Sequence, residues 1–451
     1  MLALLLSTYD LGRQPYGLAS PAAWLREAGH EVRAIDLALD PLDEDAVRAA
    51  GVIAFHLPMH TATRLAAPVL TRVRALHPGA RIVCYGLYAR HNAAYLRSLG
   101  VDDVLGGEFE EDLVAIAGGG SPAPVPPSGA LPKLAYRVPD RSGLPPLERY
   151  AHLIDADGRQ RVVGSTESTR GCKHTCRHCP VVPIYEGRFR AVPREIVLED
   201  VRRQVAAGAE HITFGDPDFW NGPTHAMAIV RALAAEHPGL TYDATIKIEH
   251  LIHHAEHLPE LAATGCLFVT SAAESIDDAV LARLDKGHTR ADVERAIALC
   301  REAGIVLQPT FIAFHPWIDQ EGYRAFLAFL DAQDLVDAVP PVQLALRLLI
   351  PGGSKLLDLP ETRALVGAFD AERLVHPWHH PDPRVDELAG HVMAAVEAGS
   401  AAGESRAEVF DRVWQMAGGS PRTPRPSRPV PHLTESWYCC AEPIEGQLSP
   451  L

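Results

Sequence analysis

The sequence contains no run of 18 consecutive apolar residues, so we do not expect a transmembrane helix. It begins with a short apolar stretch, Met1 to Thr8, that carries no basic residue, and we interpret this stretch as a strand instead of a signal peptide. Positive charge is scarce as well: 42 Lys and Arg stand against 57 Asp and Glu, which gives a formal net charge of −15. This balance disfavours nucleic acid or an anionic membrane as the main partner.

Cysteine is sparse, with 8 residues in 451, but three of the eight stand close together. Cys172, Cys176 and Cys179 have the spacing C-x3-C-x2-C. Three close thiolates can hold an iron–sulfur cluster, and a loop that supplies only three leaves one iron of a four-iron cluster open for a substrate or cofactor. The alternatives are a structural zinc site, with His174 or His178 as the fourth ligand, and three unrelated core thiols. Clustered ligating cysteines favour a reducing cytoplasm.

The stretch from Arg170 to Pro180 resembles the cysteine motif of the radical S-adenosylmethionine (radical SAM) enzymes. The resemblance implies that the three cysteines ligate a [4Fe-4S] cluster, and that S-adenosylmethionine binds the open iron through its amino and carboxylate groups. It also implies an electron donor such as flavodoxin or ferredoxin, because one electron cleaves a carbon–sulfur bond of the sulfonium. His178 stands where the family usually has another aromatic residue, and we expect its ring near the adenine.

The length of 451 residues predicts two or three domains, and residues 1–117 form the first of them. Strands that alternate with helices predict an open, doubly wound, Rossmann-like α/β sheet, whose ligands bind at the carboxyl ends of the strands. The predicted strands are 2–7, 31–37, 52–57, 81–85 and 101–105, and the predicted helices are 16–30, 61–77 and 89–99.

This layout resembles the cobalamin-binding-like domain that precedes the radical SAM domain in a large subclass of that family. The matching pieces are Gly17-Leu18, the segment 25–32 and the stretch Val104 to Glu108. The motif Asp-x-His-x-x-Gly, whose histidine ligates cobalt in some cobalamin proteins, is absent. Two interpretations stay open: a domain that binds cobalamin without a protein ligand to cobalt, and a docking domain that holds no cofactor.

Residues 118–148 are rich in Gly and Pro and predict a linker. A second strand–helix series follows in residues 149–355, and its six β/α units predict a partial (β/α)6 barrel with the active site at the carboxyl mouth. The cysteine loop follows the first strand of this barrel. The predicted strands are 161–165, 211–215, 240–246, 266–272, 306–314 and 342–350, and the clearest helices are 194–207, 226–236, 290–303 and 320–332.

Further stretches at the predicted strand ends also resemble the radical SAM pattern. Phe214 to Phe219 stands where the family has a glycine- and acid-bearing segment that contacts the amino group of S-adenosylmethionine. This implies Gly215, Asp216 and Asp218 as cofactor-binding residues, and a simple turn is the alternative.

A later stretch combines Glu274-Ser275 with Lys286-Gly287-His288-Thr289, as in the cobalamin-type subclass. The resemblance implies Glu274 as an acceptor for the ribose hydroxyls of S-adenosylmethionine, with Lys286 in the same cofactor site. Pro351-Gly352-Gly353 follows the sixth predicted strand, where the subclass often has Pro-Gly-Thr. The bulky residues Phe314, His315 and Trp317 follow the fifth strand, and they predict a narrowed mouth and a small substrate.

Two groups of histidines invite a metal-binding interpretation, but no acid or cysteine stands at a helpful spacing from either group. We therefore interpret them as solvated or core histidines. They are His250, His253, His254 and His257 in one group, and His376, His379 and His380 in the other.

The chain continues with a predicted helical extension, residues 356–417, with helices at 385–398 and 404–416. Residues 418–451 begin with a proline-rich, basic segment that predicts a flexible tether. At about 3.1 Å per extended residue, a dozen residues span roughly 37 Å, enough to cross a barrel mouth.

The tether leads to two adjacent cysteines, Cys439 and Cys440. Neighbouring Cα atoms are about 3.8 Å apart, below the roughly 4.4–6.8 Å typical of disulfides, so a disulfide between them would be strained. Two thiolates on one short segment can instead grip a single soft ion or metalloid. An accidental pair in a disordered tail is the alternative.

Residues Cys439 to Pro443 resemble the tail of the radical SAM proteins that end in Cys-Cys-Ala-Glu-Pro, the CUAEP/CCAEP-tail family, some of which carry selenocysteine at the position of Cys440. A related enzyme type, from the arsinothricin pathway, also joins a radical SAM core to a C-terminal cysteine motif. That type is thought to transfer the 3-amino-3-carboxypropyl group of S-adenosylmethionine to arsenite, although its motif differs from the tail of this chain.

Three functions are open at this point. The first is a radical SAM transferase that passes a radical-derived group to a small-molecule substrate, with Cys439 and Cys440 as catalytic residues that hold a soft arsenic, selenium or sulfur atom. The second is a cobalamin-dependent radical SAM methyltransferase with a structural or redox tail. The third is a non-catalytic metal- or metalloid-binding protein that keeps the fold.

Overall fold

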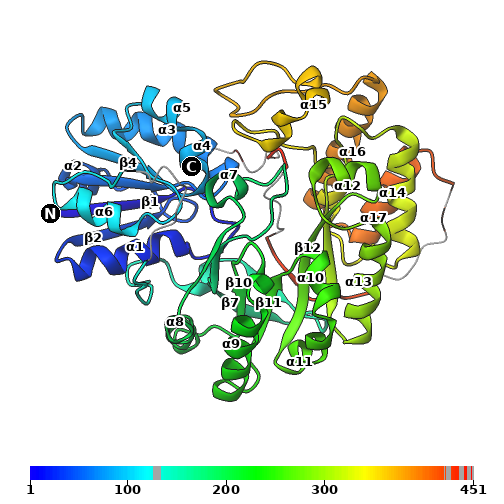
Figure 1. The fold of residues 1–451 in the computed structure, drawn as a ribbon, viewed down its shortest axis with the longest axis horizontal. Coiled ribbons are helices and arrows are strands. Elements are labelled where there is room, and N and C mark those ends of the chain that lie inside the picture. The colour runs from blue at the N-terminus through cyan, green and yellow to red at the C-terminus, as the bar shows by residue number, and fades with distance from the viewer. Residues whose placement is uncertain (125–133, 421, 423–427, 436–440, 444–447, 449–451) are drawn as a thin grey trace.

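The computed structural model describes residues 1–124, 134–420, 422, 428–435, 441–443 and 448. Its fold is α/β, as predicted, with two helix-covered sheets that lie beside each other (Figure 1). No helix in these described ranges is long and apolar enough to cross a membrane.

The first sheet has five parallel strands in the order β2-β1-β3-β4-β5. Strand β1 is a continuous apolar run because both of its faces are covered: Leu4 and Leu6 lie in one core and Leu5 lies in the other. The strand order reverses between β1 and β3, so a ligand crevice is expected at their carboxyl ends. The elements are β1 (Leu2–Ser7), α1 (Tyr16–Glu27), β2 (Glu31–Asp36), α2 (Glu44–Ala49), β3 (Val52–His56), α3 (His60–Leu76), β4 (Arg81–Tyr85), α4 (Leu87–His91), α5 (Ala93–Ser98), β5 (Asp103–Val104) and α6 (Glu110–Ala117).

The second sheet is a curled half-barrel in the order β13-β12-β11-β10-β7-β6-β14, in which β6 and β14 are the antiparallel members. Helices α8, α9, α13 and α14 share one large apolar core with its parallel strands. The elements are η1 (Leu147–Arg149), β6 (His152–Ile154), β7 (Gln160–Thr166), β8 (Thr169–Gly171), α7 (Val182–Tyr185), β9 (Phe189–Ala191), α8 (Arg194–Ala206), β10 (His211–Phe214), η2 (Phe219–Asn221), α9 (Pro223–Glu236), β11 (Thr241–Thr245), α10 (Ile248–His253), η3 (Ala255–His257), α11 (Leu258–Ala263), β12 (Cys266–Glu274), α12 (Asp278–Leu284), α13 (Arg290–Glu302), β13 (Val306–Phe311) and α14 (Gln320–Ala332).

The predicted sixth barrel strand, 342–350, is wrong. The segment begins as a 3-10 helix, η4 (Pro341–Leu344), because Pro340 and Pro341 have a fixed φ and no N–H to donate to a ladder. Beyond it, Arg347 makes a single parallel bridge with Phe314, and Leu348 makes a single antiparallel bridge with Ala441. Isolated bridges therefore stand where a sixth strand was expected.

A helical extension follows the half-barrel, as predicted. Asp382 caps the first long helix with its carboxylate, and Ser405 and Glu408 form a capping box at the next. Both helices pack against the core of the half-barrel. The remaining elements are η5 (Lys355–Asp358), α15 (Pro360–Leu365), α16 (Pro383–Ala402), α17 (Arg406–Met416) and β14 (His432–Leu433).

One buried arginine joins the two halves of the molecule. The guanidinium of Arg170, in β8, contacts Glu108 at 2.9 Å, Glu110 at 2.7 Å and Glu167 at 3.0 Å, and the first two acids belong to the first domain. The side chain of Arg170 is only 7% exposed, and those of Glu108 and Glu110 are 1% and 0% exposed. Charges buried to this extent are stable only when they are paired, so the network fixes how the domains meet.

We expect Arg170→Met to remove the main counter-charge of the buried Glu108 and Glu110, and to lower the free energy of unfolding by about 3–5 kcal/mol in urea titrations. Arg202→Met is the matched control. Arg202 pairs with Glu236 on the exposed surface, where an ion pair is worth about 0–1 kcal/mol. Equal losses in the two variants would contradict the role of Arg170.

Candidate active site between the two sheets

A cavity of about 290 Å³ lies where the carboxyl ends of the two sheets face each other, and its size is close to that of typical small-molecule sites. The first sheet contributes residues that end or follow β1, β3, β4 and β5, and the half-barrel contributes residues that end or follow β7, β10, β11 and β12. These residues include Asp10, His56, Gly86 and Gly107 from the first sheet, and Thr166, Gly215, Thr245 and Glu274 from the second.

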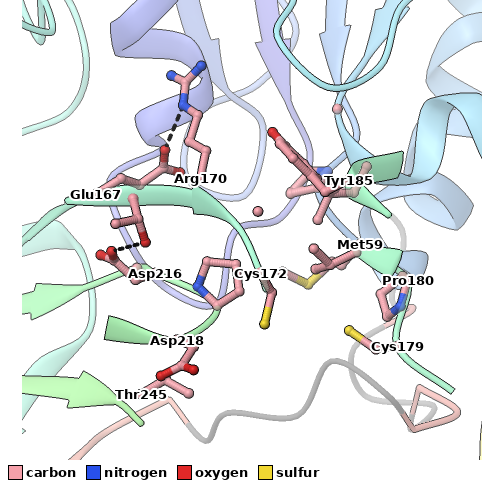
Figure 2. A pocket seen from close by; sticks show the side chains of 18 of the residues that line it. Met59, Glu167, Arg170, Cys172, Cys179, Pro180, Tyr185, Asp216, Asp218 and Thr245 are labelled. Carbon is pink, nitrogen blue, oxygen red and sulfur yellow. Dashed lines mark hydrogen bonds and ion pairs between the residues drawn. The ribbon is translucent and has the colours of Figure 1, made fainter. Parts of the chain in front are cut away.

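The three clustered cysteines all line this cavity. They lie on the loop between β8 and α7, and the side chains of Cys172 and Cys179 point into the same space (Figure 2). Six cysteines lie in the described part of the chain, and no disulfide joins any two of them. Burial, with the Asp218 carboxylate as a further cause, raises the pKa of Cys172 to about 12. Such a thiol becomes a thiolate when a metal supplies positive charge, so the loop fits a metal cluster.

Gly171 shapes the entry to this loop. Its φ is +79°, and a Cβ on it would lie 2.4 Å from the ring of Tyr185 and 2.5 Å from the carbonyl oxygen of Arg188. Only glycine fits here without displacing the backbone.

The carboxylate of Asp216 is bound to the protein around it. It accepts hydrogen bonds from the Ser168 amide at 2.9 Å, the Ser168 hydroxyl at 2.7 Å and the Thr169 hydroxyl at 2.6 Å. Burial raises the pKa of Asp216 to about 6, although these bonds act against the rise. Asp216 therefore fixes the position of Ser168 and Thr169, which lead to the cysteine loop. Contact of Asp216 or Gly215 with the amino group of S-adenosylmethionine stays a prediction.

The structure brings together three residues that the sequence assigned to cofactor binding. His178 lies 2.9 Å from the carboxylate of Glu274, and the ammonium of Lys286 lies 3.4 Å from the same oxygen. Burial alone would raise the pKa of Glu274, but Lys286 and His178 outweigh it and lower the pKa to about 2. Glu274 has a φ of +68° at the end of β12, a strained conformation of the kind found at binding sites.

Asp218, the third predicted acid, forms a cluster that sequence reasoning missed. Its Oδ2 lies 2.7 Å from Nδ1 of His250 and 3.7 Å from Nε2 of His174. Lys247 lies beside them, with its ammonium 3.1 Å from His174 Nδ1 and 2.9 Å from Glu249. His250 is a buried histidine, as one of our alternatives allowed, whereas His253 is exposed. Lys247 and His250 follow the end of β11, so their place at the barrel mouth could have been inferred from the topology.

The predicted narrowing of the mouth by Phe314, His315 and Trp317 is wrong. Phe314 stacks on Tyr323 in the core, with the ring centroids 4.6 Å apart, and none of the three predicted residues is among those that line the cavity. The strand ends early, at Phe311. The Trp317 ring lies against Arg283 of α12, whose guanidinium carbon is 5.6 Å from the ring centroid.

Cys439 and Cys440 lie outside the described residues, but the chain is held on both sides of them. On one side β14 pairs with β6 at one edge of the half-barrel. On the other side Ala441 pairs with Leu348 at the opposite edge, and the Glu442 amide donates to the Arg347 carbonyl at 3.0 Å. The half-buried Glu442 carboxylate lies 3.9 Å from Arg347 and from Arg373.

Comparison with known proteins agrees with this geometry. Residues 166–327 match the radical SAM superfamily. The chain is 25% identical over 227 residues to the ribosomal protein uS12 methylthiotransferase RimO of Geobacter sulfurreducens, which covers 45% of this chain and 49% of RimO. It is 30% identical over 178 residues to the tRNA-2-methylthio-N(6)-dimethylallyladenosine synthase of Chlorobium phaeovibrioides, which covers 36% and 38%. The chain thus spans at most about half the length of these relatives.

Two solved structures share the fold over most of the chain. The radical S-adenosylmethionine methyltransferase TsrM of Kitasatospora setae, with cobalamin and a [4Fe-4S] cluster bound, superposes with a TM-score of 0.61 at 22% identity, covering 74% of this chain and 73% of TsrM. The cobalamin-dependent radical enzyme OxsB, with aqua-cobalamin and S-adenosylmethionine bound, gives a TM-score of 0.69 at 14% identity, covering 88% and 67%.

A radical SAM domain implies a [4Fe-4S] cluster and S-adenosylmethionine as cofactors, and the three thiols of one loop fit the cluster. We expect Cys176→Ser to lower the iron content of the anaerobically reconstituted protein from about four atoms per chain to below one. Cys300→Ser is the matched control, because Cys300 is buried on α13 and is absent from the cavity wall. Iron that stays at the wild-type level in Cys176→Ser would contradict the assignment.

Proposed function

For this enzyme, which contains a radical SAM domain, we propose the transfer of a radical-derived group from S-adenosylmethionine to a soft atom held by Cys439 and Cys440. The observation that carries the proposal is the cysteine loop at the wall of a cavity between two sheets, in a chain whose tail is anchored at both edges of the half-barrel.

The cavity residues divide into cluster ligands and cofactor contacts in this proposal. Cys172, Cys176 and Cys179 hold the cluster, which supplies the electron that cleaves S-adenosylmethionine. The ionised carboxylate of Glu274 accepts hydrogen bonds from the ribose hydroxyls, and His178 and Lys286 keep it charged and fixed. Gly215, which follows β10 and lines the cavity, contacts the cofactor in this proposal.

The two anchors of the tail support a role for the adjacent cysteines. Five residues stand between Glu435 and Ala441, and the six extended Cα–Cα steps span about 20 Å. Glu435 accepts from the hydroxyl of Tyr9, two residues after β1, so this anchor lies beside the first-domain loop that lines the cavity. Two thiols on a segment of this length can hold a single arsenic, selenium or sulfur atom at the opening of the cavity.

A second candidate function is cobalamin-dependent radical methyl transfer, which the first domain supports. His56 ends β3 at the cavity wall, and within the described part of the chain its buried Nδ1 has no hydrogen-bond partner. Burial is the main cause that lowers the pKa of His56 to about 3, so the ring is neutral and can accept a hydrogen bond or ligate a metal. Gly17 makes room for it, because a Cβ there would lie 2.2 Å from the ring.

If the tail cysteines hold the substrate atom, the double variant Cys439→Ser/Cys440→Ser should lose product formation. With arsenite, reductant and S-adenosylmethionine, we expect the wild type to form an organoarsenic product, and the double variant to form at least 100-fold less at equal iron content. Chromatography of the nucleosides identifies the broken bond: methylthioadenosine indicates aminocarboxypropyl transfer, and 5′-deoxyadenosine indicates ordinary radical chemistry. Wild-type product rates in the double variant would exclude the tail role.

If neither nucleoside nor S-adenosylhomocysteine formed after reduction, both catalytic functions would be ruled out, and a non-catalytic binding protein would be left. Glu442→Gln tests the anchor separately. It keeps both thiols but removes the charge that faces Arg347 and Arg373. We expect it to lower the product rate while arsenite still binds.

The methyl-transfer candidate predicts that the chain retains cobalamin. We expect His56→Phe to lower the cobalamin that stays bound after gel filtration, read from its visible absorption, by at least tenfold. His77→Phe is the control, because His77 follows α3 at the opposite end of the first domain from the cavity. No bound cobalamin in the wild type, together with turnover that does not require it, would exclude this candidate.

A further inference from the structure

Beyond the proposed cluster, three side chains from separate elements converge at one point of the cavity wall. His174 lies on the cysteine loop, Asp218 follows β10, and His250 lies on α10. Nε2 of His174 is 3.1 Å from Nε2 of His250 and 3.7 Å from Oδ2 of Asp218, and that Oδ2 is 2.7 Å from Nδ1 of His250. One ligand atom from each residue lies within 4.8 Å of the others.

Hydrogen bonding alone does not account for this arrangement. Nδ1 of His250 and Oδ2 of Asp218 are buried 2.7 Å apart, but neither makes a hydrogen bond in the described part of the chain. Nδ1 of His174 lies 3.7 Å from the carboxylate of Glu249, so a ring with its proton on Nδ1 leaves the Nε2 lone pair directed at His250 and Asp218. Lys247 then donates to Glu249, at 2.9 Å, instead of to His174. Unsatisfied atoms at this depth are rare and require an explanation.

A divalent metal ion supplies the explanation. Imidazole nitrogen and carboxylate oxygen bind zinc at about 2.0–2.2 Å, which places neighbouring donors roughly 3–3.5 Å apart. The two separations from Oδ2 of Asp218 lie on either side of this range, at 2.7 Å to Nδ1 of His250 and 3.7 Å to Nε2 of His174. Lone pairs that face a common cation need no hydrogen between them. The charge also suits a dication, because Glu249 pairs with Lys247 at 2.9 Å and leaves the Asp218 carboxylate as the net charge of the group.

We infer that His174, Asp218 and His250 form a binding site for a divalent transition metal of the zinc type, separate from the cluster ligands. Three protein ligands leave at least one coordination position open, as in catalytic zinc sites. His174 and Asp218 line the cavity, so that position is directed to the substrate space. The metal would hold an anionic or soft donor group of the substrate beside the cysteine loop. This role replaces the contact with S-adenosylmethionine predicted for Asp218, because Oδ1 already accepts from the amide of Trp220.

The experiment uses full-length protein with its cluster reconstituted anaerobically, incubated with zinc chloride and desalted. Zinc and iron per chain are then measured by mass spectrometry. We expect about one zinc in the wild type and less than a tenth of that in His250→Gln, with iron unchanged in both. His253→Gln is the matched control, because His253 is exposed on the same helix one turn away, and it should retain the zinc.

Three outcomes would overturn the inference: no zinc in the wild type, equal zinc in His250→Gln, or a joint loss of zinc and iron in that variant. A joint loss of zinc and iron would mean that His174, Asp218 and His250 only support the cysteine loop that binds the cluster. If the wild type held zinc but no iron, the cluster assignment would fail while this site stood. Asp218→Asn provides a second variant, and we expect it to lose zinc in the same way.

X-ray absorption at the zinc edge identifies the ligands. We expect nitrogen and oxygen at about 2.0–2.2 Å with the scattering pattern of imidazole. Sulfur at about 2.3 Å would place the zinc on cysteines instead, and would contradict the inference.

Discussion

The ionic contacts of Arg170 are the constraint on which the site depends. Arg170 stands two residues before the first clustered cysteine, and its guanidinium reaches Glu108 and Glu110 in the other domain. Aromatic rings enclose it, with the centroids of Tyr16 and Phe109 each 5.5 Å from the guanidinium carbon. Because each of these charges would be costly to bury alone, small displacements of one domain are opposed, and the cysteine loop keeps its position against the first sheet.

The cavity follows from this juxtaposition. Each sheet alone exposes the carboxyl ends of its strands, where parallel folds bind ligands. The contacts of Arg170 fix the two domains relative to each other, so that the carboxyl ends of both sheets face each other. Residues from both sheets therefore form the wall of one cavity. Glu274 shows the local consequence: its strained backbone turns the carboxylate toward His178 and Lys286 instead of continuing the strand.

The tail pairs with the edge of the half-barrel at which the sixth strand is missing. Where a sixth strand was expected, Arg347 and Leu348 make single bridges, and one of these bridges binds the tail. Main-chain pairing with the tail satisfies polar groups that a regular neighbouring strand would otherwise have satisfied. The absence of a regular sixth strand therefore leaves main-chain groups at Arg347 and Leu348 that bind residues 441–442.

The sequence by itself determined the α/β class, most of the long helices and strands, and the three clustered cysteines, because hydrophobic periodicity, Gly and Pro positions and ligand spacing are local properties. It also grouped Glu274 and Lys286 with His178, through the family resemblance. It failed at 342–350, where apolar residues suggested a strand but two prolines prevented one.

Only the tertiary structure decided which distant groups meet. The approach of His250 to Asp218 and His174, and of Arg170 to Glu108, joins positions far apart in the chain, and no local pattern specifies such distances. These contacts arise because strand ends from different units converge at one edge, and because buried charges are stable only where a partner from another element reaches them.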